Sequence, residues 1–232
     1  MSWSRSSLAA LFASCVVATA CGDATNPFAS FEMRCAKPPP THFEVVTVPL
    51  TFERDDSQSI STLTAKRGSA FATHQTLGLT TATFGQNTDI QLNESDERGD
   101  SRACSTPRVH IELSMQPVKV YVASELAPHT CQHDATLLHE IKHVEVFREA
   151  LELAARDLAH DFPAAIEAQL RSATIPSELQ QRFVVAVRSY LAQFMRDREK
   201  MLDETQAAVD SSEEYARIST ACAQYAQVSG SR

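Results

Sequence analysis

The chain has 232 residues, with 21 basic and 29 acidic side chains and a formal net charge of −8. This acidic balance argues against nucleic-acid binding and against docking on anionic lipid through a basic face, since both need a surplus of Lys and Arg. Removal of a short N-terminal segment would leave roughly 210 residues, enough for one domain with a sizeable core.

The N-terminus has the composition of an export signal. Arg5 supplies a positive charge, and the apolar stretch LAALFASCVVATA (8–20) is too short to span a membrane as a mature helix. We therefore expect residues 1–20 to be a signal peptide of an exported protein. Ala18-Thr19-Ala20 fits ordinary signal peptidase, whereas the same residues followed by Cys21 resemble a bacterial lipobox, in which Cys21 becomes the lipidated N-terminus.

The number of cysteines favours the lipoprotein. The six are Cys15, Cys21, Cys35, Cys104, Cys131 and Cys222. Processing at the lipobox removes the first and acylates the second, and the remaining four suit two disulfides in an oxidising compartment, with three connectivities possible. We expect a protein that faces the periplasm or the cell exterior and meets the membrane only through its lipid anchor. A soluble secreted or periplasmic protein is the alternative, and it would have one unpaired cysteine.

Residues 21–42 predict an extended tether, because they contain Asn26-Pro27 and the run Pro38-Pro39-Pro40. From 43 to 123 the chain is rich in β-branched and aromatic residues, and strands are predicted in 42–52, 73–84, 88–92 and 108–124. The clearest alternation lies in RVHIELSMQPVKVYVAS (108–124), in which odd-numbered apolar residues give way to even-numbered ones. This change of phase predicts a hairpin that turns at Met115-Gln116-Pro117 and buries one side.

Beyond residue 134 the pattern predicts helices. Asp134 is a plausible N-cap for a helix to about His160, and Pro163 is placed to begin a short helix to about Arg171. A long helix is expected over 177–209, and a last helix follows a capping box formed by Ser211 and Glu214. The predicted fold class is α+β, with an N-terminal antiparallel β region (about 43–123) and a helical C-terminal half (about 134–228) in a single domain, 43–232.

The first of these helices carries the motif LLHEIKH (137–143). At about 100° per residue, His139 and His143 lie about 40° apart, and Glu140 lies within one turn of both. Two imidazoles four residues apart can ligate one metal ion from a rigid helix, and a glutamate between them reaches the metal-bound water as a general base. We predict a Zn²⁺ site with His139 and His143 as ligands and Glu140 as the catalytic base.

Around this motif, TLLHEIKHV (136–144) resembles the zincin metallopeptidases, although Lys142 and Glu145 are polar where that family prefers uncharged or apolar residues. The order of signal peptide, β region, cysteine and motif helix is also similar to that of little-characterised bacterial secreted zincin-like proteins. The resemblance implies a zinc-dependent peptidase that acts on a peptide or protein substrate. It also implies an edge strand that precedes the helix and aligns the substrate, and residues 118–124 stand at that place in the sequence.

The third zinc ligand separates the zincin subclasses. The metzincin pattern needs a glycine three residues after His143, where this chain has Val146, and we reject it. The gluzincin pattern uses a glutamate on a later helix, with an acid four residues on that braces a ligand histidine. Glu199 and Asp203 have this spacing and are the predicted ligand and brace, and Arg198 is expected to be paired by the carboxylates of the site. Rival ligands are Asp210, Glu213 and Glu214.

Three further histidines, His110, His129 and His133, are expected at the surface or in loops. His129 or His133, just before the motif helix, would be placed to line the cleft and help polarise a substrate carbonyl.

Two other functions remain open at this point. One is a non-catalytic exported lipoprotein or binding module whose motif helix holds a structural metal or none. The other is a purely structural exported protein with no metal. The sequence does not choose among peptide bonds, side-chain amides and cell-wall cross-links as the bond that is cleaved. We expect a monomer.

Overall fold

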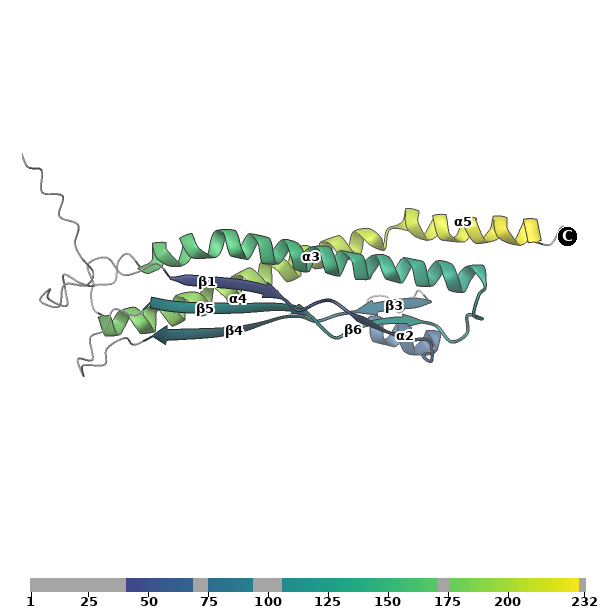
Figure 1. The fold of residues 1–232 in the computed structure, drawn as a ribbon. Coiled ribbons are helices and arrows are strands. Elements are labelled where there is room, and N and C mark those ends of the chain that lie inside the picture. Colours follow the sequence, from purple (N-terminus) through teal and green to yellow (C-terminus); the bar gives the residue numbers. More distant parts are fainter. Residues whose placement is uncertain (1–40, 69–74, 94–105, 171–175, 230–232) are drawn as a thin grey trace, which may run out of the picture. The chain divides into compact units, whose positions relative to one another are not determined.

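Two three-stranded sheets form the N-terminal half of the chain, which is described here from a computed structural model that covers residues 41–68, 75–93, 106–170 and 176–229. The first sheet has the order β1-β5-β4 and comprises β1 (His42–Thr47), β5 (Thr106–Met115) and β4 (Phe84–Asn93). The second has the order β2-β6-β3 and comprises β2 (Phe52–Asp55), β6 (Val118–Val122) and β3 (Gly78–Thr81) (Figure 1). Since β1 and β2 run parallel to their neighbours and β3 and β4 antiparallel, both sheets are mixed.

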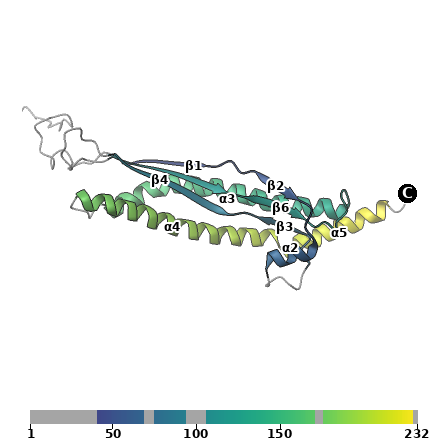
Figure 2. The same ribbon diagram turned by 90° about the horizontal axis from the view of Figure 1, so that it is seen from below.

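The predicted hairpin at 108–124 is wrong. β6 continues in the direction of β5 and does not fold back on it (Figure 1). It lies between β2 and β3 (Figure 2), so that β5 and β6 pair with different partners. On the antiparallel side Thr81 lies opposite Lys119 and Phe84 opposite Met115. Between these pairs, the two residues 82–83 face the three residues 116–118. This extra residue is a bulge, located at the cis bond of Gln116-Pro117. A one-residue shift moves alternate side chains to the other face, and it therefore explains the change of phase that suggested a turn.

Four helices are present in the described part of the chain: α2 (Ile60–Arg67), α3 (Cys131–Leu170), α4 (Pro176–Val209) and α5 (Ser212–Ser229). The long helix expected over 177–209 is confirmed as α4, whereas α2 interrupts a region expected to hold only strands. α3 begins earlier than expected and runs through Pro163 without a break. Phe162 and Ile166, on either side of this proline, are fully buried, and their packing keeps the helix continuous.

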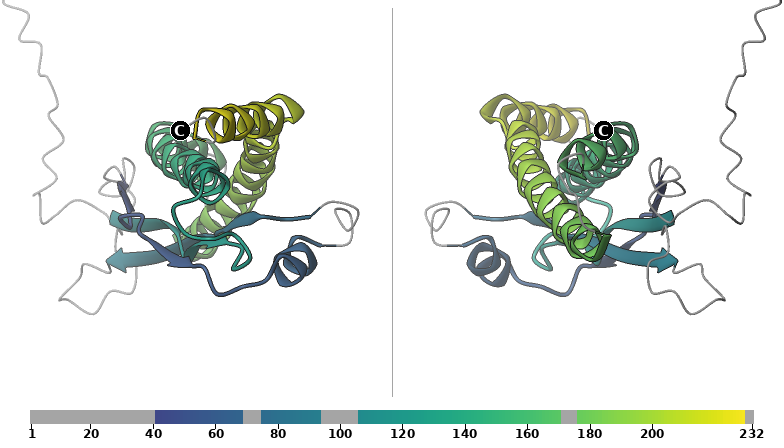
Figure 3. Two further views of the ribbon diagram at one scale, coloured as in Figure 1. Left: turned by 90° about the vertical axis from the view of Figure 1, so that its right-hand side faces the viewer. Right: turned by 90° about the vertical axis from the view of Figure 1, so that its left-hand side faces the viewer.

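α3 and α4 cover one face of the sheets, as the end-on views show (Figure 3). The core between the layers combines odd-numbered residues of β5 and even-numbered residues of β6 with apolar stripes from both helices at spacings of three and four, including Val144, Phe147, Leu151, Phe183, Val187 and Leu191. A smaller core beneath α2 contains Leu63, Tyr121 and Ala123. The α+β fold class is confirmed, with the β region first and the helices second.

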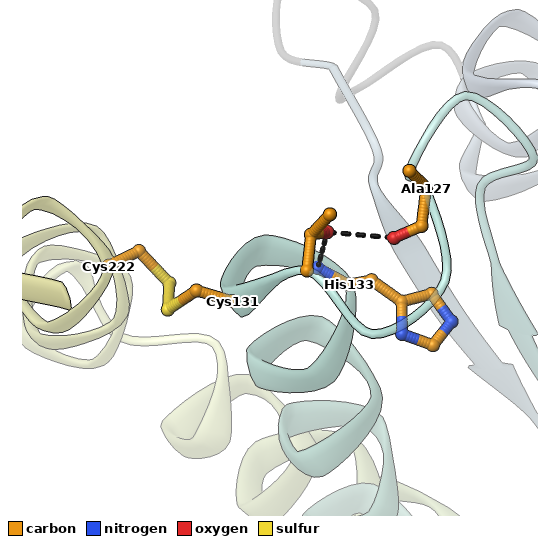
Figure 4. The surroundings of a disulfide bond; sticks show 5 residues. Ala127, Cys131, His133 and Cys222 are labelled. Carbon is orange, nitrogen blue, oxygen red and sulfur yellow. Dashed lines mark hydrogen bonds between the residues drawn. A yellow bond between two sulfur atoms is a disulfide. The ribbon is translucent and has the colours of Figure 1, made fainter. Parts of the chain in front are cut away.

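Several predicted features lie outside the described residues, namely the signal peptide (1–20), Cys21, most of the tether, Cys35 and Cys104. Of the disulfide candidates, Cys131 at the start of α3 is bonded to Cys222 in α5, across a sequence separation of 91 (Figure 4). Within the described ranges, no helix has the length and apolar character needed to cross a membrane.

Candidate metal centre

The motif residues lie in the N-terminal part of α3, where this helix packs against β3 and α5. Thr130 caps the helix, because its Oγ1 accepts a hydrogen bond from the amide of His133 at 3.3 Å and donates one to the carbonyl of Ala127 at 2.8 Å (Figure 4). Downstream of this cap, the exposed fractions of His139, Glu140 and His143 are 4%, 4% and 8%. The three polar side chains are therefore buried at the edge of the core, as the helical wheel predicts.

The two imidazoles converge on a single carboxylate, that of Asp210, in the turn between α4 and α5. Oδ1 of Asp210 lies 3.1 Å from Nε2 of His139 and 3.3 Å from Nε2 of His143. One ligand atom from each residue lies within 4.8 Å of the other two, and these residues form the potential metal-binding group found among the described residues. Ligand atoms of a tetrahedral metal ion with bonds of about 2.0–2.1 Å lie about 3.3 Å apart, so the two distances to Oδ1 of Asp210 are compatible with a bound metal ion.

The remaining ring nitrogens support the same arrangement. Nδ1 of His143 is hydrogen-bonded to Oε1 of Gln206, whose Nε2 donates to the carbonyl of His143 at 3.2 Å, and these bonds fix the ring with Nε2 directed at the group. Nδ1 of His139 is buried without a hydrogen-bond partner, and Oε1 of Glu214 lies 3.8 Å away. A small movement would let this carboxylate accept the Nδ1 proton, which is how ligand histidines are usually held.

Asp210 is anionic in this environment. Burial alone would raise its pKa, but hydrogen bonds from His139, His143 and the Tyr215 hydroxyl, the last at 2.7 Å, hold it well below the ordinary range. The second oxygen, Oδ2, accepts a hydrogen bond from Arg67 at 2.7 Å. Burial and the bond to Asp210 raise the pKa of Tyr215 to about 12. Its hydroxyl therefore remains protonated at neutral pH and donates to the carboxylate.

Histidine protonation competes with metal binding at this centre. Burial lowers the pKa of His143, but its hydrogen bonds to Asp210 and Gln206, together with the charge of Glu140, outweigh burial and raise the pKa above the ordinary value. A metal ion must displace that proton, so the affinity for metal is coupled to pH.

Glu140 lies beside the potential ligands on the wall of a cleft of about 550 Å³. Burial raises its pKa, although the histidines and a hydrogen bond from Thr80 Oγ1 to Oε2, at 2.8 Å, oppose the shift. A carboxyl group with a raised pKa, open to a cleft and held by a hydrogen bond, has the properties of a general base.

β3 approaches α3 closely because it has a glycine at the contact. A Cβ on Gly78 would lie 2.5 Å from Oε1 of Glu140 and 2.7 Å from Cγ2 of Thr136. Real side chains do not come so near, so a larger residue here would push β3 or the Glu140 carboxylate away.

We therefore expect Gly78→Ala to lower the free energy of unfolding by about 1–3 kcal/mol, the usual cost of overpacking. Gly85→Ala is the matched control, because its Cβ would meet only Oγ of Ser114 at 3.2 Å. Urea unfolding of both variants measures the difference. Equal stability of the two would contradict the close approach of β3 to Glu140.

The structure does not bring the predicted ligand Glu199 into the metal-binding group. Glu199 and Asp203 are exposed and line the cleft, but the acidic groups at the histidine ring nitrogens belong to Asp210 and Glu214. Arg198 is paired away from the site, with Asp157 at 2.8 Å, and its guanidinium stacks over Phe194. Asp210, a rival in the sequence analysis, is instead the third member of the potential metal-binding group.

Two further expectations need correction. Residues 118–124 do not form an edge strand, because β6 is central in its sheet, and the edge strand that lines the cleft is β3. His133 is buried and not in a loop, with Nε2 2.9 Å from Arg54 and Nδ1 2.7 Å from Asp134. By contrast, His110 is part-exposed and paired with Glu44, and His129 is exposed in the loop before α3.

Sequence reasoning missed the residues that support the centre, namely Arg67, Gly78, Thr80, Gln206 and Tyr215. None belongs to a motif, and all reach the site from elements distant in sequence. Asp210 was named as a rival ligand, and it directly precedes the predicted capping box of α5. The structure confirms this cap with a hydrogen bond from the amide of Glu214 to Oγ of Ser211 at 3.3 Å.

No family model, no curated protein and no solved structure matches this chain.

Proposed function

We propose that this protein is an exported zinc-dependent hydrolase, and specifically a peptidase. The observation that carries the proposal is the convergence of His139, His143 and Asp210 on one point beside the buried carboxyl group of Glu140. Three protein ligands suit a catalytic zinc, which keeps a fourth position for water or substrate, whereas structural zinc usually has four.

The chain's own residues divide the work of hydrolysis. When bound, zinc would supply Lewis-acid activation of water and of the substrate carbonyl. Glu140 accepts the proton of the attacking water and returns it to the leaving amine, while Thr80 holds the carboxylate in position. Arg67 and Tyr215 fix the carboxylate of Asp210. His143 is oriented by Gln206.

The edge strand β3 supports a peptide as the substrate. Gly78, Thr80 and Thr81 line the cleft that holds Glu140 and His143, and among the described strands β3 pairs with β6 alone. An extended peptide can add to such an edge through main-chain hydrogen bonds. β3 therefore takes the place that the zincin resemblance gave to residues 118–124, and it favours a main-chain bond over a side-chain amide.

The first test is the metal content of the mature protein, purified with its disulfides intact. We expect about one zinc per chain by elemental analysis, and no zinc in a His139→Ala/His143→Ala variant. His160→Ala is the matched control, because this histidine is exposed on the same helix. Absence of metal from the wild type in the presence of added zinc would refute the proposal. A zinc with four protein ligands would favour a binding module.

A further inference from the structure

The segment that carries Asp210 lacks buried apolar anchors. The apolar stripe of α4 ends at Phe194, and from 195 to 223 no side chain is fully buried. Met195 and Leu202 are partly buried against the core. Because burial of apolar area provides most of the stability of a docked helix, the end of α4 and the described side chains of α5 depend on other contacts.

Those contacts are mostly polar, apart from a contact of the Tyr215 ring with the His139 ring and one covalent bond. Gln206 bonds to His143, Lys142 pairs with Glu214, and Tyr215 bonds to Asp210. Further along α5, the disulfide joins Cys222 to Cys131, which lies about two turns before His139 on α3 (Figure 4). The segment from Gln206 to Cys222 is therefore attached to α3 at both ends, and Asp210, Glu214 and Tyr215 lie between the attachments.

We propose that the Cys131–Cys222 disulfide is an oxidative switch that assembles the metal centre. In the dithiol form the described side chains of α5 are held to α3 by the Tyr215–His139 ring contact and by ion pairs such as Lys142–Glu214, and exposed ion pairs are individually weak. In part of the population Tyr215 and Glu214 then move away from the histidines. Asp210 in those molecules loses the hydrogen bond from Tyr215 that helps to hold it. A ligand held in place for only part of the time lowers the apparent affinity for metal.

The switch involves two electrons. The thiols of Cys131 and Cys222 each lose one proton and one electron, the sulfur–sulfur bond forms, and a disulfide of the oxidant is reduced to a dithiol by exchange. Oxidants of this class act in extracytoplasmic compartments, whereas cytoplasmic thiols keep cysteines reduced. The centre would thus bind metal more tightly after export, and the hydrolase would be less active where it is made.

Thermodynamic linkage makes the switch measurable in both directions. If the disulfide raises the affinity for zinc, saturating zinc must stabilise the disulfide by the same factor. For a two-electron couple, each tenfold difference in affinity lowers the reduction potential by about 30 mV. Zinc held by the free thiols would act in the opposite direction and raise the potential.

The test compares zinc affinity in the oxidised protein with that in a Cys131→Ser/Cys222→Ser variant, by competition with a chromogenic chelator. We expect the variant to bind at least about tenfold more weakly. Ala221→Ser, next to the cysteine and exposed, should match the wild type. In parallel, the reduction potential of the wild-type disulfide is measured with and without zinc, which keeps the proposal testable if the double variant does not fold. We expect zinc to lower the potential by at least about 30 mV.

The outcomes separate this inference from the proposed function on which it rests. Equal affinities together with an unchanged or raised potential would overturn the switch and leave the zinc site standing. Failure of the oxidised wild type to bind zinc would overturn both.

Discussion

Replacement of Glu140 by Gln is expected to leave zinc bound and to abolish hydrolysis. The amide has the size of the carboxyl group and can still accept the hydrogen bond from Thr80, but it cannot take a proton from water. Loss of general base catalysis commonly costs about 10²–10⁴-fold in rate. The rate is measured on a mixed fluorogenic peptide library, and the zinc content of each sample is determined in parallel.

The matched control is Glu145→Gln, one turn further along α3. Glu145 is exposed and pairs with Arg148, so the substitution removes a carboxylate from the same helix without reaching the cleft. We expect it to change the rate by less than about twofold, as a surface substitution far from the site. Full activity of Glu140→Gln would exclude Glu140 as the base, and loss of zinc from this variant would make Glu140 a ligand.

Stability gives an independent check on the same variant. Burial raises the pKa of Glu140, so keeping this side chain ionised costs free energy in the folded protein. A neutral Gln avoids this cost, and we therefore expect no loss of stability on replacement. A raised carboxyl pKa makes a folded protein less stable as the pH rises through the unfolded-state value, because the unfolded chain ionises more readily. In the absence of metal, the variant should lack this part of the pH dependence.

The local geometry of the motif could be predicted because it depends on a single helix. His139, Glu140 and His143 share one sector at 100° per residue, and the same rule places Lys142 and Glu145 towards solvent, where the structure finds them. The apolar stripe of α4 was predictable for the same reason, since Phe183, Val187 and Leu191 are buried. Periodicity thus gives the buried face of each helix without knowledge of its neighbour.

The identity of the proposed third ligand depends on how two helices pack, and the periodicity of either helix alone does not determine this. α3 and α4 are antiparallel, and the contacts of Gln206 with His143 and of Arg198 with Asp157 fix their register. In this register Glu199 lies about two turns of α3 beyond His143, although it faces the same cleft. The spacing of Glu199 and Asp203 matched a family pattern, but the offset between the helices places Asp210 at the histidines.

The sheet shows a second limit of the same kind. A change from odd to even apolar positions has two physical causes, a turn or a bulge, and both produce the pattern seen at 108–124. Only the strand partners distinguish them, and those partners, β1 to β4, are earlier in the chain. The consequence for the site is that β6 becomes a central strand and β3 becomes the exposed edge beside Glu140.

Replacement of Asp210 by Asn is expected to lower the affinity for zinc by roughly 100-fold or more, because loss of even a residue that supports a ligand typically costs 10–100-fold. Asn keeps the shape of the side chain but removes the charge that both imidazoles and Arg67 contact. Competition with a chelator at neutral pH measures the effect. The comparison variant, Glu199→Gln, neutralises a carboxylate on the same cleft and should bind zinc within about twofold of the wild type.

The reverse result would be weak zinc binding by Glu199→Gln and normal zinc binding by Asp210→Asn. It would require the end of α4 to shift along α3 when metal binds. Such a shift would have to break the bonds of Gln206 to His143 and of Arg198 to Asp157, which fix the position of α4 along α3.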